Sequence, residues 1–168
     1  RTLIEKEPNY SAVSARLLLD NLRAEALQYL QIADSATHAQ MTQLYPQAFT
    51  AYIKKGVELE LLDPQLNGFD LDMLGEALLP DRDLQFTYLG LQTLYDRYFI
   101  HSDETRFELP QIFFMRVAMG LAAREDNPTK RAIEFYDLLS SFDYMSSTPT
   151  LFNAGTLRPQ LSSCFLTT

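Results

Sequence analysis

The sequence predicts a mainly α-helical, multi-helix domain that ends in an extended segment and one β-strand. Apolar residues recur at helical spacing through most of the chain, as at Ala15, Leu19 and Leu22 in a helix expected over 11–33. Prolines and Asn-Gly or Asn-Pro pairs separate these apolar stretches. After residue 146 the pattern changes to proline, glycine and hydroxyl residues, which favours extended and turn structure.

The remaining helices follow from the same periodicity and from their start signals. Pro110 is expected in a first helical turn, where its missing N–H has no cost, and Asn127 is expected as an N-cap. The apolar run 112–123 contains Arg116 and is too short to cross a bilayer, so it is interpreted as a buried core helix. Two short pieces, 98–100 and 105–109, are expected to pair as a hairpin. Further helices are predicted over residues 45–60, 70–79, 84–100, 110–124 and 128–141.

Composition restricts the class of protein. The 168 residues are 46% hydrophobic and 21% charged, which is ordinary for a globular domain of this length. The net charge of −8 and the scattered basic residues argue against a nucleic-acid surface. A single cysteine excludes an internal disulfide and fits a reducing, cytoplasmic setting.

Three polar residues outside the tail are candidate ligands. His38 lies in a polar stretch without a second histidine or cysteine nearby, so its side chain is predicted to be solvated. Asp81 and Asp83 are expected to be solvated charges or helix caps, because a hard cation needs more oxygen ligands than they supply.

The chemistry is expected in the tail. Residues 148–152 are predicted to be extended, since proline disfavours helix in the residue before it, and 153–156 to form a turn whose N–H groups can cradle an anionic oxygen. Residues 160–168 are predicted as a strand that pairs with sequence outside this chain. A lone cysteine such as Cys164 is most often buried and inert. The alternative is a thiol beside a phosphate or sugar site, where hydrogen-bond donors would come from the adjacent Ser162 and Ser163 and from Thr148 and Thr150.

A resemblance extends over residues 8–168. The tail TPTLFNAGTLRPQLSSCFL is similar to the start of the catalytic barrel in the large subunit of class I ribonucleotide reductase. The segments LQFTYLGLQTLYDRYFI from Leu84, LPQIFFMRVAMGLA from Leu109 and FYDLLSSFDYMSS from Phe135 resemble the same family. The Ser-Ser doublet before Cys164 looks like class I rather than the cobalamin-dependent relatives.

The resemblance implies a domain organisation. In the family, a helical domain precedes a ten-stranded α/β barrel. Residues 1–9 would then be a linker or the trailing edge of an upstream ATP-cone, residues 10–146 the helical domain, and residues 147–168 the start of the barrel.

It also implies a function in deoxyribonucleotide biosynthesis for DNA replication. The family reduces ribonucleoside diphosphates by thiyl-radical chemistry. Cys164 matches one of the redox-active cysteine pair, and Thr148 and Ser163 match substrate-binding positions; the partner cysteine and the radical cysteine lie downstream in the family.

The implied partners are the remainder of the barrel and a radical-generating small subunit with its own metal or radical cofactor. Thioredoxin or glutaredoxin would be the reductant, and ATP and deoxynucleotides the allosteric effectors. No cofactor, nucleic acid or membrane is expected to bind these 168 residues, which are expected to be inactive alone. The alternatives are a non-catalytic helical interaction module or one piece of a split large subunit.

Overall fold

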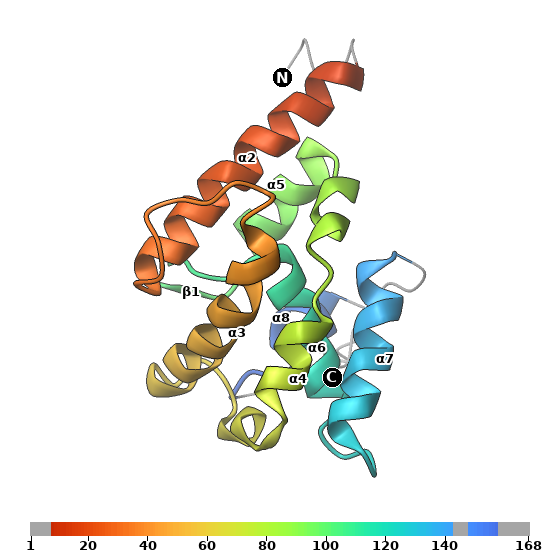
Figure 1. Ribbon diagram of the computed structural model, residues 1–168. Coiled ribbons are helices and arrows are strands. Elements are labelled where there is room, and N and C mark those ends of the chain that lie inside the picture. The colour runs from red at the N-terminus through yellow and green to blue at the C-terminus, as the bar shows by residue number, and fades with distance from the viewer. Residues whose placement is uncertain (1–7, 143–147, 158–168) are drawn as a thin grey trace, which may run out of the picture.

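The computed structural model describes residues 8–142 and 148–157, apart from the side chains of residues 8, 9, 148, 149 and 152. Helices dominate these residues, and one very short hairpin accompanies them (Figure 1). The elements, in order, are α2 (Pro8–Tyr29), α3 (Met41–Glu58), η1 (Pro64–Gly68), α4 (Leu71–Ala77), η2 (Pro80–Gln85), α5 (Tyr88–Arg97), β1 (His101–Ser102), β2 (Thr105–Arg106), α6 (Pro110–Ala122), α7 (Pro128–Ser140) and α8 (Thr148–Asn153).

Helix starts follow the start signals in the sequence. The Asn127 side chain accepts a hydrogen bond from Lys130 N at 3.3 Å, which confirms it as the N-cap of α7. Pro110 lies in the first turn of α6, also as predicted. The helix expected over 84–100 begins only at Tyr88, because Thr87 accepts from Gly90 N at 3.1 Å and thereby caps α5 at that point.

Helix α6 forms the centre of the core. Nearly all of its residues are buried, from Pro110 to Met119 and again at Ala122. It packs most extensively along α7, while α2 packs on α5 and α3 packs on α4. Figure 1 shows the N-terminal end of α2 projecting beyond the other helices. The prediction that residues 112–123 form a buried core helix is therefore confirmed.

The hairpin is shorter than expected and is shifted along the chain. Strands β1 and β2 pair antiparallel, with His101 opposite Arg106 and Ser102 opposite Thr105. Asp103, at φ 53°, occupies the left-handed region in the connecting turn, a conformation that aspartate tolerates better than most residues.

The prediction of extended backbone over residues 148–152 was wrong. These residues belong to helix α8, and Pro149 occupies its first turn. A backbone N–H at that position has no intrahelical acceptor, so the N–H that proline lacks is not missed. Proline disfavours helical backbone at the preceding Thr148, but contacts with another helix stabilise α8 in spite of this. That support comes from α6, against which α8 packs.

The strand predicted over residues 160–168 lies outside the described residues. The described chain ends in a turn whose Thr156 forms an isolated antiparallel bridge with Leu62. Within the described ranges, no helix is both long and apolar enough to cross a membrane.

Candidate functional site

The structure places the predicted site residues unequally. Thr148 is the first residue of α8, and its side chain is outside the description. Ser163 and Cys164 lie outside the described residues. The geometry that the structure does show is the support of α8 and of the turn that follows it.

A buried arginine holds the C-terminal end of α8. Arg116, on α6, is completely buried, and it donates from Nη1 to the Ala154 carbonyl at 2.8 Å and from Nη2 to the Leu151 carbonyl at 3.2 Å. The last carbonyls of a helix have no intrahelical partner, and a cation at that end also interacts favourably with the helix dipole. Arg116 therefore serves as a C-terminal cap supplied by a different helix.

The charge of Arg116 is balanced inside the core. Its Nε and Nη2 donate to the two carboxylate oxygens of buried Glu108 at 2.9 and 3.1 Å. The Tyr52 hydroxyl donates to the same carboxylate, and Ile100 N donates to it at 3.3 Å. A buried ion pair is tolerated when further hydrogen bonds complete it in this way. We call Tyr52, Glu108 and Arg116 the clamp.

The clamp has defined protonation states. Burial, together with the Glu108 carboxylate, raises the pKa of Tyr52 well above its ordinary value. Burial opposes the charge on Arg116, but the adjacent Glu108 carboxylate more than compensates, so the pKa of the guanidinium is raised. Tyr52 therefore remains a hydrogen-bond donor, and Arg116 remains a cation, throughout the physiological pH range.

The turn after α8 is tied to the loop that follows α3. Asp63 N donates to the Gly155 carbonyl at 3.0 Å, and Leu157 N donates to the Leu61 carbonyl at 3.4 Å. Gly155 has φ 76°, which favours glycine, and a Cβ on Gly120 of α6 would overlap its backbone nitrogen. The turn thus fits against α6 through two glycines.

The turn predicted over residues 153–156 is confirmed, but its expected role as an anion cradle is wrong for two of its N–H groups, and the N–H of the residue that follows the turn is occupied as well. Ala154 N donates to Thr150 O at 2.9 Å, Thr156 N to Asn153 O at 3.0 Å, and Leu157 N to Leu61 O. These donors stabilise the helix end and the turn, so they are not available to a ligand.

A second buried polar cluster is centred on Asp83. Its carboxylate accepts from the Tyr45 hydroxyl at 2.7 Å and from Gln111 Nε2 at 2.8 Å, and it lies 3.8 Å from Arg23 Nη2. Gln111 Oε1 in turn accepts from the Tyr136 hydroxyl at 2.5 Å. The expectation that Asp83 is a solvated charge or a cap was therefore wrong: hydrogen bonds from the core helices α3 and α6 stabilise its burial.

The environment of Asp83 changes its acidity. Burial raises the pKa of the carboxyl group to about 6, although the hydrogen bonds from Gln111 and Tyr45 act in the opposite direction. Asp81, by contrast, is exposed, and its Oδ1 lies 2.8 Å from His38 Nε2. His38 also lies 3.3 Å from Arg23, so it is not simply a solvated side chain as expected.

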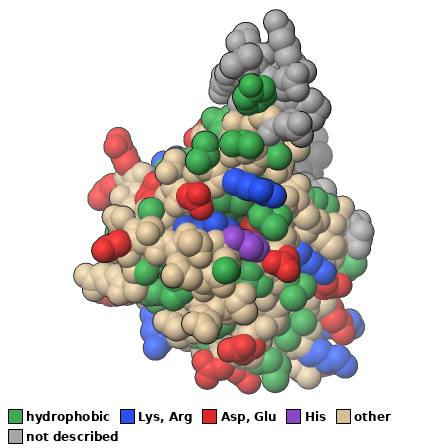
Figure 2. Space-filling model, turned by 45° about the horizontal axis from the view of Figure 1, so that its top comes forward, with side chains coloured by type: hydrophobic (Ala, Val, Ile, Leu, Met, Phe, Trp, Pro, Cys, Tyr) green, Lys and Arg blue, Asp and Glu red, His purple; other side chains and the backbone are tan. Residues whose placement is uncertain are grey.

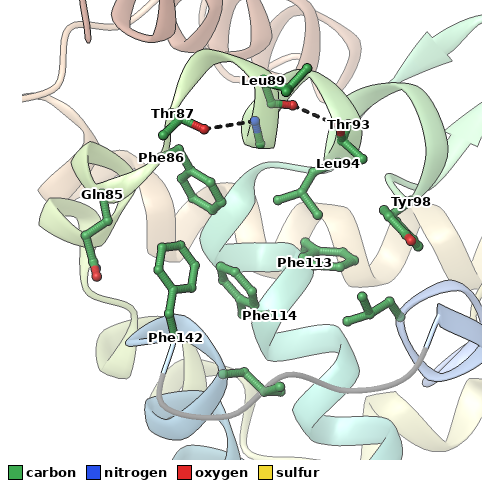
Figure 3. Close-up of a pocket in the computed structure, with 13 residues that line it drawn as sticks. Gln85, Phe86, Thr87, Leu89, Thr93, Leu94, Tyr98, Phe113, Phe114 and Phe142 are labelled. Carbon is green, nitrogen blue, oxygen red and sulfur yellow. Dashed lines mark hydrogen bonds between the residues drawn. The ribbon is translucent and has the colours of Figure 1, made fainter. Parts of the chain in front are cut away.

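An apolar pocket of about 710 Å³ opens between α5, α6, α7 and α8. Figure 3 shows the rings of Phe86, Phe114 and Phe142 around it, with Leu94 and Phe113 deeper along α5 and α6. Leu89 and Phe142 at its edge are 68% and 40% exposed, so the apolar lining of the pocket is open to solvent. Within residues 8–142 and 148–157, no group of three histidine, cysteine or acidic side chains could hold a metal ion.

Sequence reasoning missed the clamp. The available signal was a charge inside the apolar run of α6, because a fully buried arginine needs an acidic partner, and Glu108 precedes Arg116 by eight residues. The position of Tyr52, far earlier in the chain, gives no such signal.

The chain is similar to a known family over its whole length. Residues 84–159 match the model of the ribonucleotide reductase all-alpha domain. The subunit alpha of ribonucleoside-diphosphate reductase from Chlamydia muridarum is 51% identical over 168 residues, which is 100% of this chain and 16% of that protein. The corresponding subunit from Helicobacter pylori is 40% identical over 95% of this chain and 19% of the relative.

A eukaryotic relative matches as well. The large subunit of ribonucleoside-diphosphate reductase from Danio rerio is 33% identical over 98% of this chain and 20% of its own length. The chain thus spans between one sixth and one fifth of the length of these relatives. The match covers the helical core, the clamp, α8 and the tail together, and the chain therefore belongs to the ribonucleotide reductase large-subunit family.

Proposed function

We propose that the chain supplies the helical domain, and the start of the catalytic barrel, of a cytoplasmic ribonucleoside-diphosphate reductase. The observation that carries the proposal is the 51% identity over all 168 residues to a reductase subunit alpha. The reaction replaces the 2′ hydroxyl of a ribonucleoside diphosphate with hydrogen. Two thiols become a disulfide, and the hydroxyl leaves as water.

Cys164 is the proposed member of the redox pair nearest the departing 2′ hydroxyl. A thiol that is oxidised with a second cysteine must be accessible to it and must be reduced again by an external dithiol after each turnover. Thioredoxin or glutaredoxin would supply that dithiol. A thiyl radical on another cysteine, generated with the small subunit, would abstract the 3′ hydrogen and start the reaction.

Thr148 and Ser163 are the proposed substrate-binding residues. Hydroxyl groups donate hydrogen bonds to ribose and diphosphate oxygens without adding charge. Thr148 begins α8, so the proposed role requires α8 to hold a fixed position. The clamp and the Gly120–Gly155 contact support that requirement, because they fix the other end of α8 and the turn that follows it.

The remainder of the large subunit is the proposed partner for the apolar pocket. The pocket is lined by Phe86, Phe114 and Phe142, and Leu89 is exposed at its edge. Covering these side chains with another apolar surface removes them from water and so stabilises the protein. The relatives are five to six times longer than this chain, so the same polypeptide can supply that surface. Effector binding by ATP and deoxynucleotides would also belong to the complete subunit.

The test of the redox assignment uses the complete large subunit with its small subunit. Cys164→Ser is expected to abolish multiple turnover with thioredoxin while the circular dichroism spectrum stays unchanged. Thr167→Ala, in the same segment at a residue with no proposed role, is the matched control and is expected to keep turnover. Normal multiple turnover in Cys164→Ser would refute the assignment of Cys164.

A further inference from the structure

A second pocket, of about 660 Å³, lies between α2, the loop over residues 35–40 and η2. Its volume is within the range of small-molecule sites. Figure 2 shows a face on which basic side chains and a histidine gather between acidic side chains. The polar residues that line the pocket include Arg16, Asp20, Arg23, Thr37, His38 and Gln40.

Arg23 is the buried cation of this pocket, and its contacts are long. The residue is 3% exposed. Its Nη1 lies 3.3 Å from Asp20 Oδ1, and its Nη2 lies 3.3 Å from His38 Nδ1 and 3.8 Å from Asp83 Oδ2. Within the described part of the chain, its buried Nε has no hydrogen-bond partner. Charge-assisted hydrogen bonds normally measure about 2.7–2.9 Å, so this guanidinium is poorly coordinated.

The clamp arginine shows what full coordination looks like in the same protein. Arg116 donates to its acceptors at 2.8, 2.9, 3.1 and 3.2 Å, and each of its three guanidinium nitrogens has an acceptor. Both arginines are buried in the same helical domain. Since a buried guanidinium without good acceptors is costly, the difference indicates that Arg23 is suited to an acceptor that enters through the pocket.

His38 is a wall of the pocket rather than the missing acceptor. Arginine can only donate, so His38 Nδ1 accepts from Arg23 and Nε2 carries the proton. That Nε2–H donates to Asp81 Oδ1 at 2.8 Å. The histidine ring is therefore held from both sides, and its bond to Arg23, at 3.3 Å, is the longer of the two.

The stripe of α2 that faces the pocket carries two arginines around one aspartate. Arg16, Asp20 and Arg23 are spaced by four and three residues and therefore share one face of the helix. The Asp20 side chain is 59% exposed, and among the described residues its ion pair is the 3.3 Å contact with Arg23, so it is a weak internal counter-ion that a stronger anion can displace.

We propose that this pocket binds a small molecule through a phosphate group held by Arg23 and Arg16. A phosphate carries close to two negative charges at neutral pH, which the two guanidinium groups balance once Asp20 turns away. Thr37 and Gln40 supply neutral polar groups at the rim, and Leu19 and Leu84 supply apolar wall for the rest of the ligand.

The test measures phosphate binding to the 168-residue chain by isothermal titration calorimetry, with chloride at the same ionic strength as the reference. Inorganic phosphate is expected to bind more tightly than chloride. Arg16→Gln is expected to weaken phosphate binding about tenfold, because an exposed charge-assisted hydrogen bond is lost without a change in the core. Asp20→Asn is expected to tighten it about threefold, because the competing carboxylate is removed.

Two comparisons make the test decisive. Arg97→Gln changes an exposed arginine of α5 that does not line the pocket, and it is expected to leave phosphate affinity unchanged. The proposal is overturned if phosphate binds no more tightly than chloride, if Arg16→Gln and Asp20→Asn bind as the native chain does, or if Arg97→Gln weakens binding as much as Arg16→Gln. Because Arg16 and Asp20 are both exposed, these outcomes do not depend on whether an Arg23 variant folds.

Discussion

Removal of the clamp arginine is expected to be among the most damaging single substitutions in this chain. In Arg116→Met, the carboxylate of Glu108 stays fully buried without its counter-ion, and the carbonyls of Leu151 and Ala154 lose their donors. Breaking a buried ion pair by removing one partner costs about 3–5 kcal/mol. The apolar methionine fills much of the same volume, so the loss measures charge and hydrogen bonding more than packing.

Urea unfolding followed by circular dichroism measures this loss as a decrease in the free energy of unfolding. Arg131→Met is the matched control, because Arg131 also contacts a glutamate, Glu134, at 2.8 Å, but both side chains are about half exposed. Exposed pairs contribute about 0–1 kcal/mol. The double variant Glu108→Gln with Arg116→Met is expected to recover part of the loss. A loss in Arg116→Met no larger than that in Arg131→Met would refute this account of the clamp.

Three further predictions concern packing, pH and the exposed apolar pocket. Gly120→Ala is expected to lower the free energy of unfolding in urea by about 1–3 kcal/mol, because the new Cβ would lie 2.7 Å from the carbonyl carbon of Ala154. Gly68→Ala is the control, since a Cβ there has nothing within 4 Å. Equal losses of stability in the two variants would contradict the reasoning. Burial raises the pKa of Asp83 to about 6 from an unfolded value near 4, so its contribution to stability is complete below about pH 4 and is lost as the pH rises through 6. Between those limits, the stability of Asp83→Asn relative to the native chain is expected to rise by roughly 3 kcal/mol in urea unfolding, and a constant difference would argue against the raised pKa. The isolated chain is expected to bind a fluorescent hydrophobic dye at its apolar pocket, and Leu89→Ser is expected to reduce the signal; the absence of dye binding would contradict an exposed docking surface.

Local signals were sufficient to predict the starts of α6 and α7 and the burial of α6. The Asn127 cap, the first-turn Pro110 and the apolar run of α6 each depend on neighbours within a few residues, and each was confirmed. Helix α8 could not be predicted in this way. Six residues that include Pro149 make a poor helix alone, and the donor that stabilises its end, Arg116, is more than thirty residues away in the sequence.

The sequence also did not show which charged side chains are buried. The side chains of Asp81 and Asp83 look equivalent in the charged triplet 81–83, yet the first is exposed and the second is 1% exposed. Only the folded positions of Tyr45 and Gln111 distinguish them, because these residues supply the donors. The resemblance of the tail to ribonucleotide reductase carried the prediction of the family, whereas the roles of Thr148, Ser163 and Cys164 stay predictions.

The clamp also has a consequence for synthesis of the protein on the ribosome. Tyr52, Glu108 and Arg116 all leave the ribosome before residues 151 and 154, so the ion pair can form inside the helical core before α8 exists. The guanidinium then presents its remaining donors as a preformed receptor for the end of α8. The helical domain can in this way act as a template that orients the emerging chain at the point where the barrel is expected to begin.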